Sequence, residues 1–414
     1  MQHKILSWAA KVILLLFLIT NVFLGYLGIS SILLTLSVYV ILWMVLRWLV
    51  KFNFNSNAER QKNVMLLVST LVICLFVGEL SLRYVFKINV NYAEANGDFF
   101  YQSEFKQYKT FNLVSRLNKG ETIPIILHKP YANSVINRPD FKFVHKYNSL
   151  GLRGNEEDAK NNNDHFRIIS LGDSFTEGVG VPEDSTWTKL LESKLNERSP
   201  GFRTVDCVNA GINGSDPFFE YQTLKSIVTH FNPDMVILSI NRSDLHDVVI
   251  RGGMDRFKDN GKIKYNDTRW WASIYQVSYI ARALFRSIGH YKWNLLTLRE
   301  NKIAELESVE KIRQLILNEY LPLADKYGFQ LIVVIHPVKF ELEMDEFALN
   351  ELPKKLKDVN GLTTYNLFEE FTRYCSDHDI SYDEIYWPTD LHHNAKGYNI
   401  WAETLFEKIK NKVH

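Results

Sequence analysis

The chain has 414 residues, of which 46% are hydrophobic and 23% are charged, and its formal net charge is +1. This composition excludes disordered and fibrous proteins and leaves room for two or three structural units. A nearly neutral chain without a basic patch that interleaves with aromatics gives no reason to expect nucleic acid as a partner. Cys74, Cys207 and Cys375 have no metal-ligand spacing, and we expect them to be buried thiols.

Three apolar stretches near the amino terminus, residues 8–29, 31–50 and 63–86, are each about 20 residues long. This length is enough to cross the hydrocarbon core of a bilayer. A signal peptide is the alternative for the first stretch, but no small-residue cleavage site follows it and a second apolar stretch begins at once. We therefore predict a membrane anchor over residues 1–87 with three transmembrane helices.

Basic residues predict the orientation of this anchor. The link between the first two stretches is uncharged, whereas Lys51, Arg60 and Lys62 lie around the link between the second and the third. By the positive-inside rule, this link and the amino terminus face the cytoplasm, so the remainder of the chain is extracytoplasmic, in the periplasm of an inner (plasma) membrane protein. Glu79 and Arg83, four residues apart, either pair on one helix face or sit at the membrane interface.

The remaining sequence is predicted to form a lead-in region and one α/β domain. The apolar residues of 88–164 follow neither a helical nor a strand period, and we interpret this region as a stalk with lead-in strands. From residue 165 to 414, short apolar runs alternate with helical patterns, which is typical of a parallel sheet with right-handed crossovers. The predicted strands are Ile168–Leu171, Arg203–Val208, Met235–Ile240 and Leu331–Ile335, and the predicted helices are Thr186–Arg198, Phe218–His230 and Ala395–Val413.

Residues 245–325 interrupt this alternation and are predicted to be a helical insertion rich in aromatic residues. The aromatics either form the core of a helical subdomain or line a cap that stacks on a sugar or touches the membrane surface. Both interpretations stay open at this point.

The strongest chemical signal is Gly172-Asp-Ser174, which follows the predicted strand Ile168–Leu171. Gly-Asp-Ser is common turn chemistry, yet a serine at such a turn lies at the carboxyl edge of a parallel sheet, where the next helix begins. Near the carboxyl terminus, the loop Asp390-Leu-His-His-Asn394 supplies histidines and a carboxylate. A histidine can accept the serine proton, and a carboxylate can orient the imidazole.

With the loop Asn209-Ala-Gly-Ile-Asn-Gly214 and Ser243-Asp244 at a strand end, these blocks resemble the GDSL or SGNH hydrolase family. The resemblance covers about residues 147–414. It implies a three-layer α/β/α domain and esterase chemistry on acyl groups, with no metal and no organic cofactor.

The resemblance also implies the oxyanion hole. Ser174 matches the nucleophile, whose own N–H is one donor, and Gly214 matches the glycine that supplies a second N–H, with Gly211 as the alternative turn glycine. Ser243 stands where the family has an asparagine as third donor. Asn241, two residues earlier, is the alternate for that role.

The base implied by the resemblance is His392 or His393, paired with Asp390. A late Asp-x-His-x-Asn run, which includes Asn394, favours His392. The other histidine is then a neighbour or a substrate contact. His336, at the end of a predicted strand, is a further candidate that we interpret as a structural turn residue.

We therefore expect a membrane-anchored serine esterase that hydrolyses acyl esters, with O-acetyl groups on envelope polysaccharide, or lipid esters, as the substrate class. An O-acyltransferase that passes the same acyl group from serine to a glycan is the first alternative. A non-catalytic glycan-binding or assembly protein is the second. Membrane lipid is a further expected partner, and the sequence does not indicate any protein partner.

Overall fold

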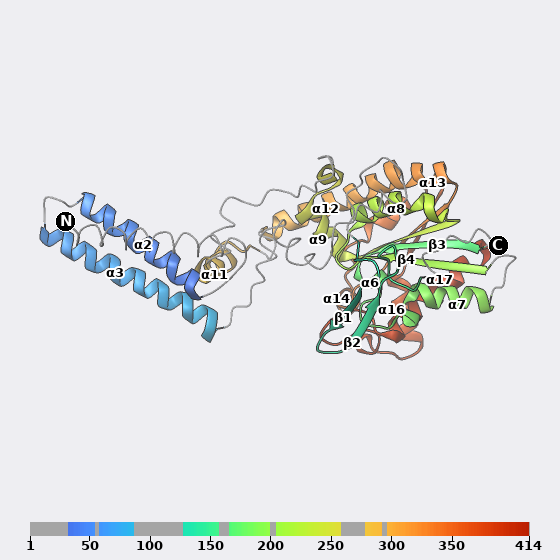
Figure 1. Ribbon diagram of the computed structural model, residues 1–414, viewed down its shortest axis with the longest axis horizontal. Helices are drawn as coiled ribbons and strands as arrows, with labels where there is room; N and C mark the ends of the chain where they lie inside the picture. Colours follow the sequence, from blue (N-terminus) through green and yellow to red (C-terminus); the bar gives the residue numbers. More distant parts are fainter. Residues whose placement is uncertain are drawn as a thin grey trace. The chain divides into compact units, whose positions relative to one another are not determined.

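The computed structural model describes residues 32–53, 58–86, 127–156, 165–198, 204–257, 278–291 and 296–413 (Figure 1). The chain forms two compact units. Unit 1 comprises Met1–Lys106 and Asn266–Lys302, and unit 2 comprises Gln107–Tyr265 and Ile303–His414. The predicted helical insertion is thus divided, because its residues 266–302 belong to unit 1 and its flanking residues belong to unit 2.

Two antiparallel helices, α2 (Ile32–Asn53) and α3 (Ala58–Leu80), dominate the described part of unit 1. The ring of Tyr39 meets that of Phe76 edge-on, with centroids 5.7 Å apart, and Trp43 Nε1 donates to Ser69 Oγ at 3.0 Å. Helix α3 continues into the π-helical turn η1 (Ser81–Val85).

Both helices are long and apolar enough to cross a membrane. Two of the three predicted spans are therefore long, apolar helices in the described part of the chain. The predicted first span, residues 8–29, lies outside the described residues. Cys74 corrects a second expectation, since its side chain on α3 is exposed, whereas Cys207 and Cys375 are buried as predicted.

Unit 2 is built on a five-stranded parallel sheet in the order β4-β3-β5-β6-β7. The strands are β3 (His165–Gly172), β4 (Thr204–Gly211), β5 (Met235–Ile240), β6 (Gln330–Ile335) and β7 (Leu362–Asn366). The α/β fold and its parallel sheet are as predicted. The order places β4, β3 and β5 side by side, so the loops that follow these three parallel strands meet at one edge of the sheet.

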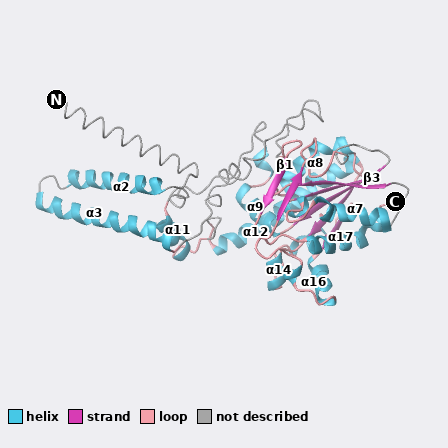
Figure 2. Ribbon diagram, turned by 60° about the horizontal axis from the view of Figure 1, so that its bottom comes forward, coloured by secondary structure: helices cyan, strands magenta, loops and turns pink. Residues whose placement is uncertain are grey.

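Helices cover both faces of this sheet (Figures 1 and 2). One buried cluster contains Ile169 and joins the sheet to α8, α9, α12 and α13, and the other contains Ile168 and joins it to α7, α16 and α17. Successive strand residues point to opposite faces, which divides the core into two layers. The helix bounds are α7 Trp187–Arg198, α8 Pro217–Phe231, α9 Arg242–Arg251, α12 Leu298–Leu315, α13 Leu321–Tyr327, α16 Phe368–Asp377 and α17 Ala395–Ile409.

A stacked pair of indole rings joins α7 to α17. The rings of Trp187 and Trp401 are 5.2 Å apart and nearly parallel, and both side chains are fully buried. Large buried aromatic surfaces of this kind stabilise a core strongly. The pair fixes the carboxyl-terminal helix, and with it the loop that precedes the helix.

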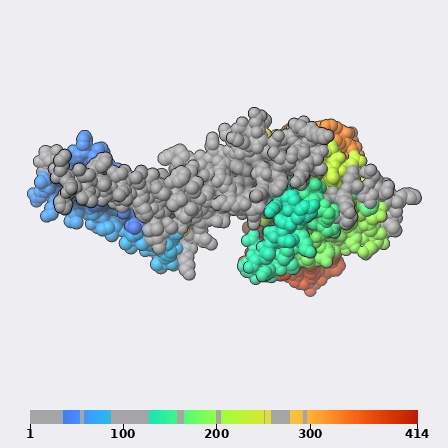
Figure 3. Space-filling model, viewed as in Figure 1, coloured from blue at the N-terminus to red at the C-terminus, as the bar shows by residue number. Residues whose placement is uncertain are grey.

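An antiparallel hairpin, β1 (Asn133–Asn137) and β2 (Lys142–Lys146), forms the lead-in to the sheet. Its turn is Arg138 to Phe141, where Arg138 N donates to Phe141 O at 2.9 Å. In the space-filling view the hairpin region, coloured teal, lies on the surface of unit 2 next to residues of the carboxyl-terminal part, coloured red (Figure 3).

Candidate active site

Ser174 lies shortly after the interior strand β3, in the one-turn helix α6 (Ser174–Glu177). Asp173 caps this helix by accepting a hydrogen bond from Phe175 N at 2.9 Å, and Gly178, in the left-handed region, ends it. Serine is therefore the first residue of a tightly bounded turn. Only 7% of Ser174 is exposed, so the hydroxyl is held in a defined direction.

The structure brings Ser174, His392 and Asp390 together in a chain of hydrogen bonds. His392 Nε2 lies 2.7 Å from Ser174 Oγ, and His392 Nδ1 lies 2.5 Å from Asp390 Oδ1. Burial raises the pKa of Asp390, but the hydrogen bond and charge of His392, with Arg138 adding to them, outweigh it and lower that pKa. The carboxylate is therefore ionised beside the imidazole, as orientation of the tautomer requires.

The structure places His393 in the core rather than against Ser174. It is fully buried, stacks on Tyr386 with ring centroids 4.1 Å apart, and its Nδ1 lies 3.3 Å from Ile385 O. Burial lowers the pKa of His393 to about 3. His336 is also fully buried, and its ring packs on Trp401 at 4.2 Å. Both are neutral side chains that pack beneath the site.

Two residues of the β1–β2 turn contact the loop that carries Asp390, and sequence analysis missed both. Arg138 Nε lies 3.4 Å from Asp390 Oδ2. Asp140 Oδ2 accepts hydrogen bonds from Thr389 N at 2.7 Å and from Asp390 N at 2.8 Å. Burial raises the pKa of Asp140, but these backbone donors outweigh it and lower that pKa. The turn therefore completes the support of the carboxylate from the side opposite His392.

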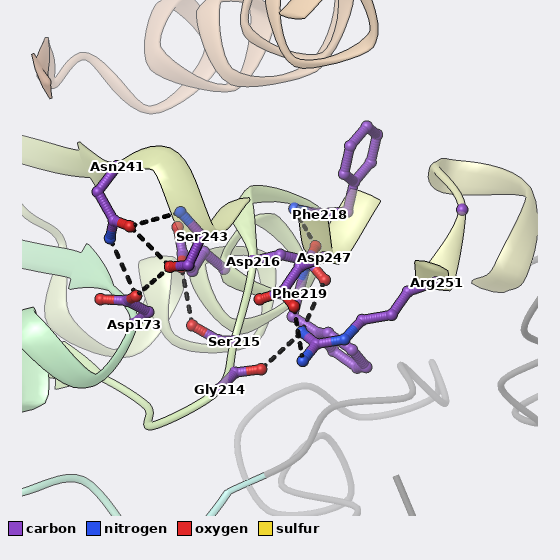
Figure 4. A network of polar contacts seen from close by, with 12 residues as sticks. Asp173, Gly214, Ser215, Asp216, Phe218, Phe219, Asn241, Ser243, Asp247 and Arg251 are labelled. Carbon is purple, nitrogen blue, oxygen red and sulfur yellow. Dashed lines mark hydrogen bonds and ion pairs between the residues drawn. The ribbon is translucent and has the colours of Figure 1, made fainter. Parts of the chain in front are cut away.

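Gly214 lies in a turn after β4 that is held from two sides. Its φ of 75° is in the left-handed region, which glycine adopts without strain. Asn213 N donates to Glu177 Oε2 at 2.5 Å. Gly214 O accepts from Arg251 Nη1 at 2.6 Å (Figure 4). Gly211, the alternative glycine, ends β4, and a Cβ there would lie 2.2 Å from Glu177 N. Gly211 therefore serves close packing, while Gly214 forms the turn.

Arg251 is itself held by acidic residues. It is fully buried apart from 1% of its side chain and pairs with Asp216 at 3.2 Å and with Asp247 at 3.2 Å (Figure 4). Burial raises the pKa of Asp216, but Arg256 and Arg251 outweigh it and lower that pKa. Asp216 also caps α8. The position of the Gly214 turn is thus fixed by a buried network of charges.

Ser243 and Asn241 both point to Asp173 (Figure 4). Asn241 Nδ2 donates to Asp173 Oδ2 at 3.0 Å, and Ser243 Oγ lies 3.0 Å from the same oxygen and 2.6 Å from Asn241 Oδ1. Asn241 is fully buried and caps α9. Through these contacts, Asn241 and Ser243, which follow β5, hold the side chain of Asp173, the residue that precedes Ser174.

Glu177 joins three segments around the serine turn, and sequence analysis did not single it out. Its carboxylate accepts from Tyr147 Oη at 2.7 Å, lies 3.2 Å from His145 Nδ1 and 3.4 Å from His128 Nε2, and binds Asn213 N. Burial raises the pKa of Glu177, but these imidazoles outweigh it and hold that pKa well below its ordinary value.

Comparisons with known proteins find similar solved structures, several of which are described as esterases. Neither a protein-family model nor a curated relative matches the chain. One similar structure is a two-domain esterase active on acetylated mannans, with 15% identity and a TM-score of 0.35. That match covers 60% of this chain and 50% of the esterase, so the chain spans about half of that protein's length.

Two other similar structures are matched along almost their whole length. An acetyl xylan esterase has 15% identity and a TM-score of 0.37, over 59% of this chain and 99% of that one. A protein from Desulfitobacterium hafniense, described as lipolytic and of the G-D-S-L family, has 12% identity and a TM-score of 0.28, again over 59% and 99%.

Replacing Asp140 tests whether the β1–β2 turn holds the loop that carries Asp390 and His392. We expect Asp140→Ala to lower kcat for an aryl acetate by about 10- to 100-fold, because small displacements of a catalytic group are costly. Asp140→Asn keeps an oxygen acceptor for the two backbone N–H groups and should retain most of the rate. Equal rates for the parent and both variants would contradict this role.

Replacing Glu177 tests the buried carboxylate. We expect Glu177→Gln to lower the free energy of unfolding at pH 7 by about 3 kcal/mol, because removing the charge leaves buried partners uncompensated. A lowered folded-state pKa means that the stabilisation is present above the ordinary value of 4.5 and is lost as the pH falls through the folded-state pKa. The difference between parent and variant should therefore shrink in acid.

Urea unfolding of the full chain in detergent, followed by tryptophan fluorescence at pH 7 and pH 4, measures this difference. Glu197→Gln, on the exposed end of α7, is the matched control and should change little. A difference that grows in acid would show that the carboxylate does not stabilise the fold in its charged form.

Proposed function

We propose that the chain is a serine ester hydrolase of the SGNH type, anchored in a membrane. The observation that carries this proposal is the pair of short contacts at His392, with Ser174 Oγ 2.7 Å from Nε2 and Asp390 Oδ1 2.5 Å from Nδ1. A serine with a base within hydrogen-bond reach, and a carboxylate behind the base, is the arrangement that activates a hydroxyl as a nucleophile.

The proposed reaction has two halves. His392 Nε2 accepts the proton of Ser174 while Oγ attacks the acyl carbon, and the imidazolium then protonates the leaving alcohol as the ester C–O bond breaks. In the second half, His392 takes a proton from water, the hydroxide attacks the acyl-serine, and the carboxylic acid leaves as Ser174 regains its proton. Asp390 stabilises the imidazolium in both halves.

The oxyanion is proposed to bind the N–H groups of Ser174 and Gly214. The Gly214 turn supports this role, because its neighbours are fixed by Glu177 and Arg251 and it need not reorganise during the reaction. Ser243 is the proposed third donor. Its hydroxyl has one proton, so it must exchange a bond to Asp173 or Asn241 for one to the oxyanion.

We propose O-acetyl esters on cell-envelope polysaccharide as the substrate class. Two helices long and apolar enough to span a membrane support the anchor, and Lys51, Arg60 and Lys62 at their linked ends favour a cytoplasmic position for that link. With that orientation, the chain after α3 is extracytoplasmic. The esters proposed there are the O-acetyl groups on envelope glycans. The location alone carries this assignment of substrate.

Ester hydrolysis by the full chain tests the nucleophile and the base. We expect Ser174→Ala and His392→Ala each to lower kcat for 4-nitrophenyl acetate by roughly 10⁴-fold, because the groups act as one unit. Ser193→Ala and His378→Ala change the same residue types at exposed positions and should leave the rate unchanged. A parent no faster than Ser174→Ala would exclude free hydrolysis and direct attention to acyl transfer onto glycan.

The third oxyanion donor is tested by Ser243→Ala. A full donor is worth about 10²- to 10³-fold in kcat. Because the Ser243 hydroxyl already serves Asp173 and Asn241, we expect a loss of about tenfold or less in kcat for the same ester. A loss of 10²-fold or more at unchanged stability would mean that the hydroxyl turns fully to the oxyanion.

A further inference from the structure

Unit 1 contains a short helix, α11 (Tyr279–Ser287), that comes from the middle of the sequence and packs on α3. Figures 1 and 2 both place it beside one end of the α2–α3 pair. Ser278 caps α11 by accepting from Ala281 N at 3.1 Å. The proposed hydrolase reaction uses no residue of this helix.

Glu79 of α3 holds the start of α11. The carboxylate is fully buried, although α3 is apolar. It accepts hydrogen bonds from Ser278 Oγ at 3.0 Å, Ile280 N at 3.1 Å, Tyr279 N, and Tyr39 Oη of α2 at 3.3 Å. A negative charge at a helix amino terminus, bound to its free N–H groups, is favourable. Neither interpretation of Glu79 included this contact with α11.

The position of Glu79 along α3 places α11 at one boundary of the proposed span. Lys62 and Glu79 are 17 residues apart on one helix, which corresponds to about 26 Å at 1.5 Å per residue. The hydrocarbon core of a bilayer is about 30 Å thick. With the basic residues around Lys62 at the cytoplasmic boundary, Glu79 and the start of α11 lie near the opposite boundary.

One face of α11 is apolar and uncovered. Leu284 and Ile288, one turn apart and therefore on the same face, are 51% and 74% exposed. The other side carries Arg282, which is buried and lies over the ring of Tyr279 at 4.4 Å. Apolar side chains are also exposed on the helix that α11 packs against and on the turn that continues it, with Val77 of α3 at 54% and Val85 of η1 at 73% exposed.

We propose that α11 is an interfacial helix whose face of Leu284 and Ile288 inserts into the outer lipid surface of the membrane, with Glu79 fixing its amino terminus. The occupant is a bilayer because α11 packs on α3, which is long and apolar enough to cross a membrane, and lies near the boundary of that proposed span. The proposal rests on the membrane anchor of the proposed function. In this proposal, the segment inserted between β5 and β6 attaches the chain to the membrane a second time. This attachment is separate from the covalent connection after α3.

A fluorophore on Ile288 tests this proposal in the full chain. Ile288→Cys is made in a Cys74→Ala background and labelled with NBD in detergent, where buried Cys207 and Cys375 do not react. The protein is then reconstituted into phosphatidylcholine–phosphatidylglycerol vesicles with or without doxyl-labelled lipid. Ser193→Cys, on the exposed surface of α7, is the control.

We expect the emission at position 288 to shift to the blue and to be quenched at least twofold by doxyl lipid, while position 193 is unaffected. Glu79→Gln should reduce the quenching at 288 by more than half, because Gln lacks the charge that holds the amino terminus of α11. Glu59→Gln, at the exposed start of the same helix, should not.

Two results would overturn the proposal while leaving the anchor intact. Equal quenching at 288 and 193 in a protein that resists carbonate extraction would mean that α11 stays in water. A blue shift without quenching would mean that protein, from this chain or a second copy, covers the face. Release by carbonate would refute the anchor itself, and ester hydrolysis, measured in parallel, reports separately on the catalytic proposal.

Discussion

The buried carboxylate of Glu177 is the contact on which the candidate site depends. It binds Tyr147 of the lead-in segment and Asn213 of the turn after β4, and it belongs to the same short helix as Ser174. Taking a carboxylate out of water costs several kcal/mol, which its partners offset only when all are in place. The lead-in hairpin, the serine turn and the Gly214 turn are therefore expected to assemble as one structure.

Opposite charges act on the two sides of the Gly214 turn. Glu177 accepts from the N–H of Asn213, and Arg251 donates to the carbonyl of Gly214. Each charge is in turn neutralised by buried partners, which for Arg251 are Asp216 and Asp247. The peptide units on either side of the one that carries the Gly214 N–H are therefore both held, which restricts rotation of that N–H, and fixed N–H dipoles are what an oxyanion hole requires. The glycine allows the turn, while the surrounding charges fix its direction.

Much of this arrangement follows from local sequence, because apolar runs and turn residues report on local structure. The bounds of β5, Met235–Ile240, coincide with those predicted, since every residue of that strand is buried. Asn394 caps α17 by accepting from Lys396 N and Gly397 N, which sets the register that turns His392 to Ser174. The edge strand β7 was missed because it is only half-buried and carries two threonines, so its apolar signal is weak.

The supporting contacts could not be predicted, because they join residues far apart in the sequence. Asp140 meets Asp390 across 250 positions, and no local pattern in the turn indicates that partner. The same holds for α11, which the sequence places in the catalytic region and the structure places in unit 1.

Glu79 and Glu177 follow one physical rule in two settings. Each is a carboxylate buried away from water whose hydrogen bonds come from distant segments. An unpaired charge at such a position would cost far more free energy than a poorly packed apolar contact. Apolar surfaces can pack in many ways, whereas a buried carboxylate is stable only beside a segment whose hydrogen-bond donors lie within reach of its oxygens. In this chain the apolar residues make folding favourable, and the buried carboxylates select which segments meet.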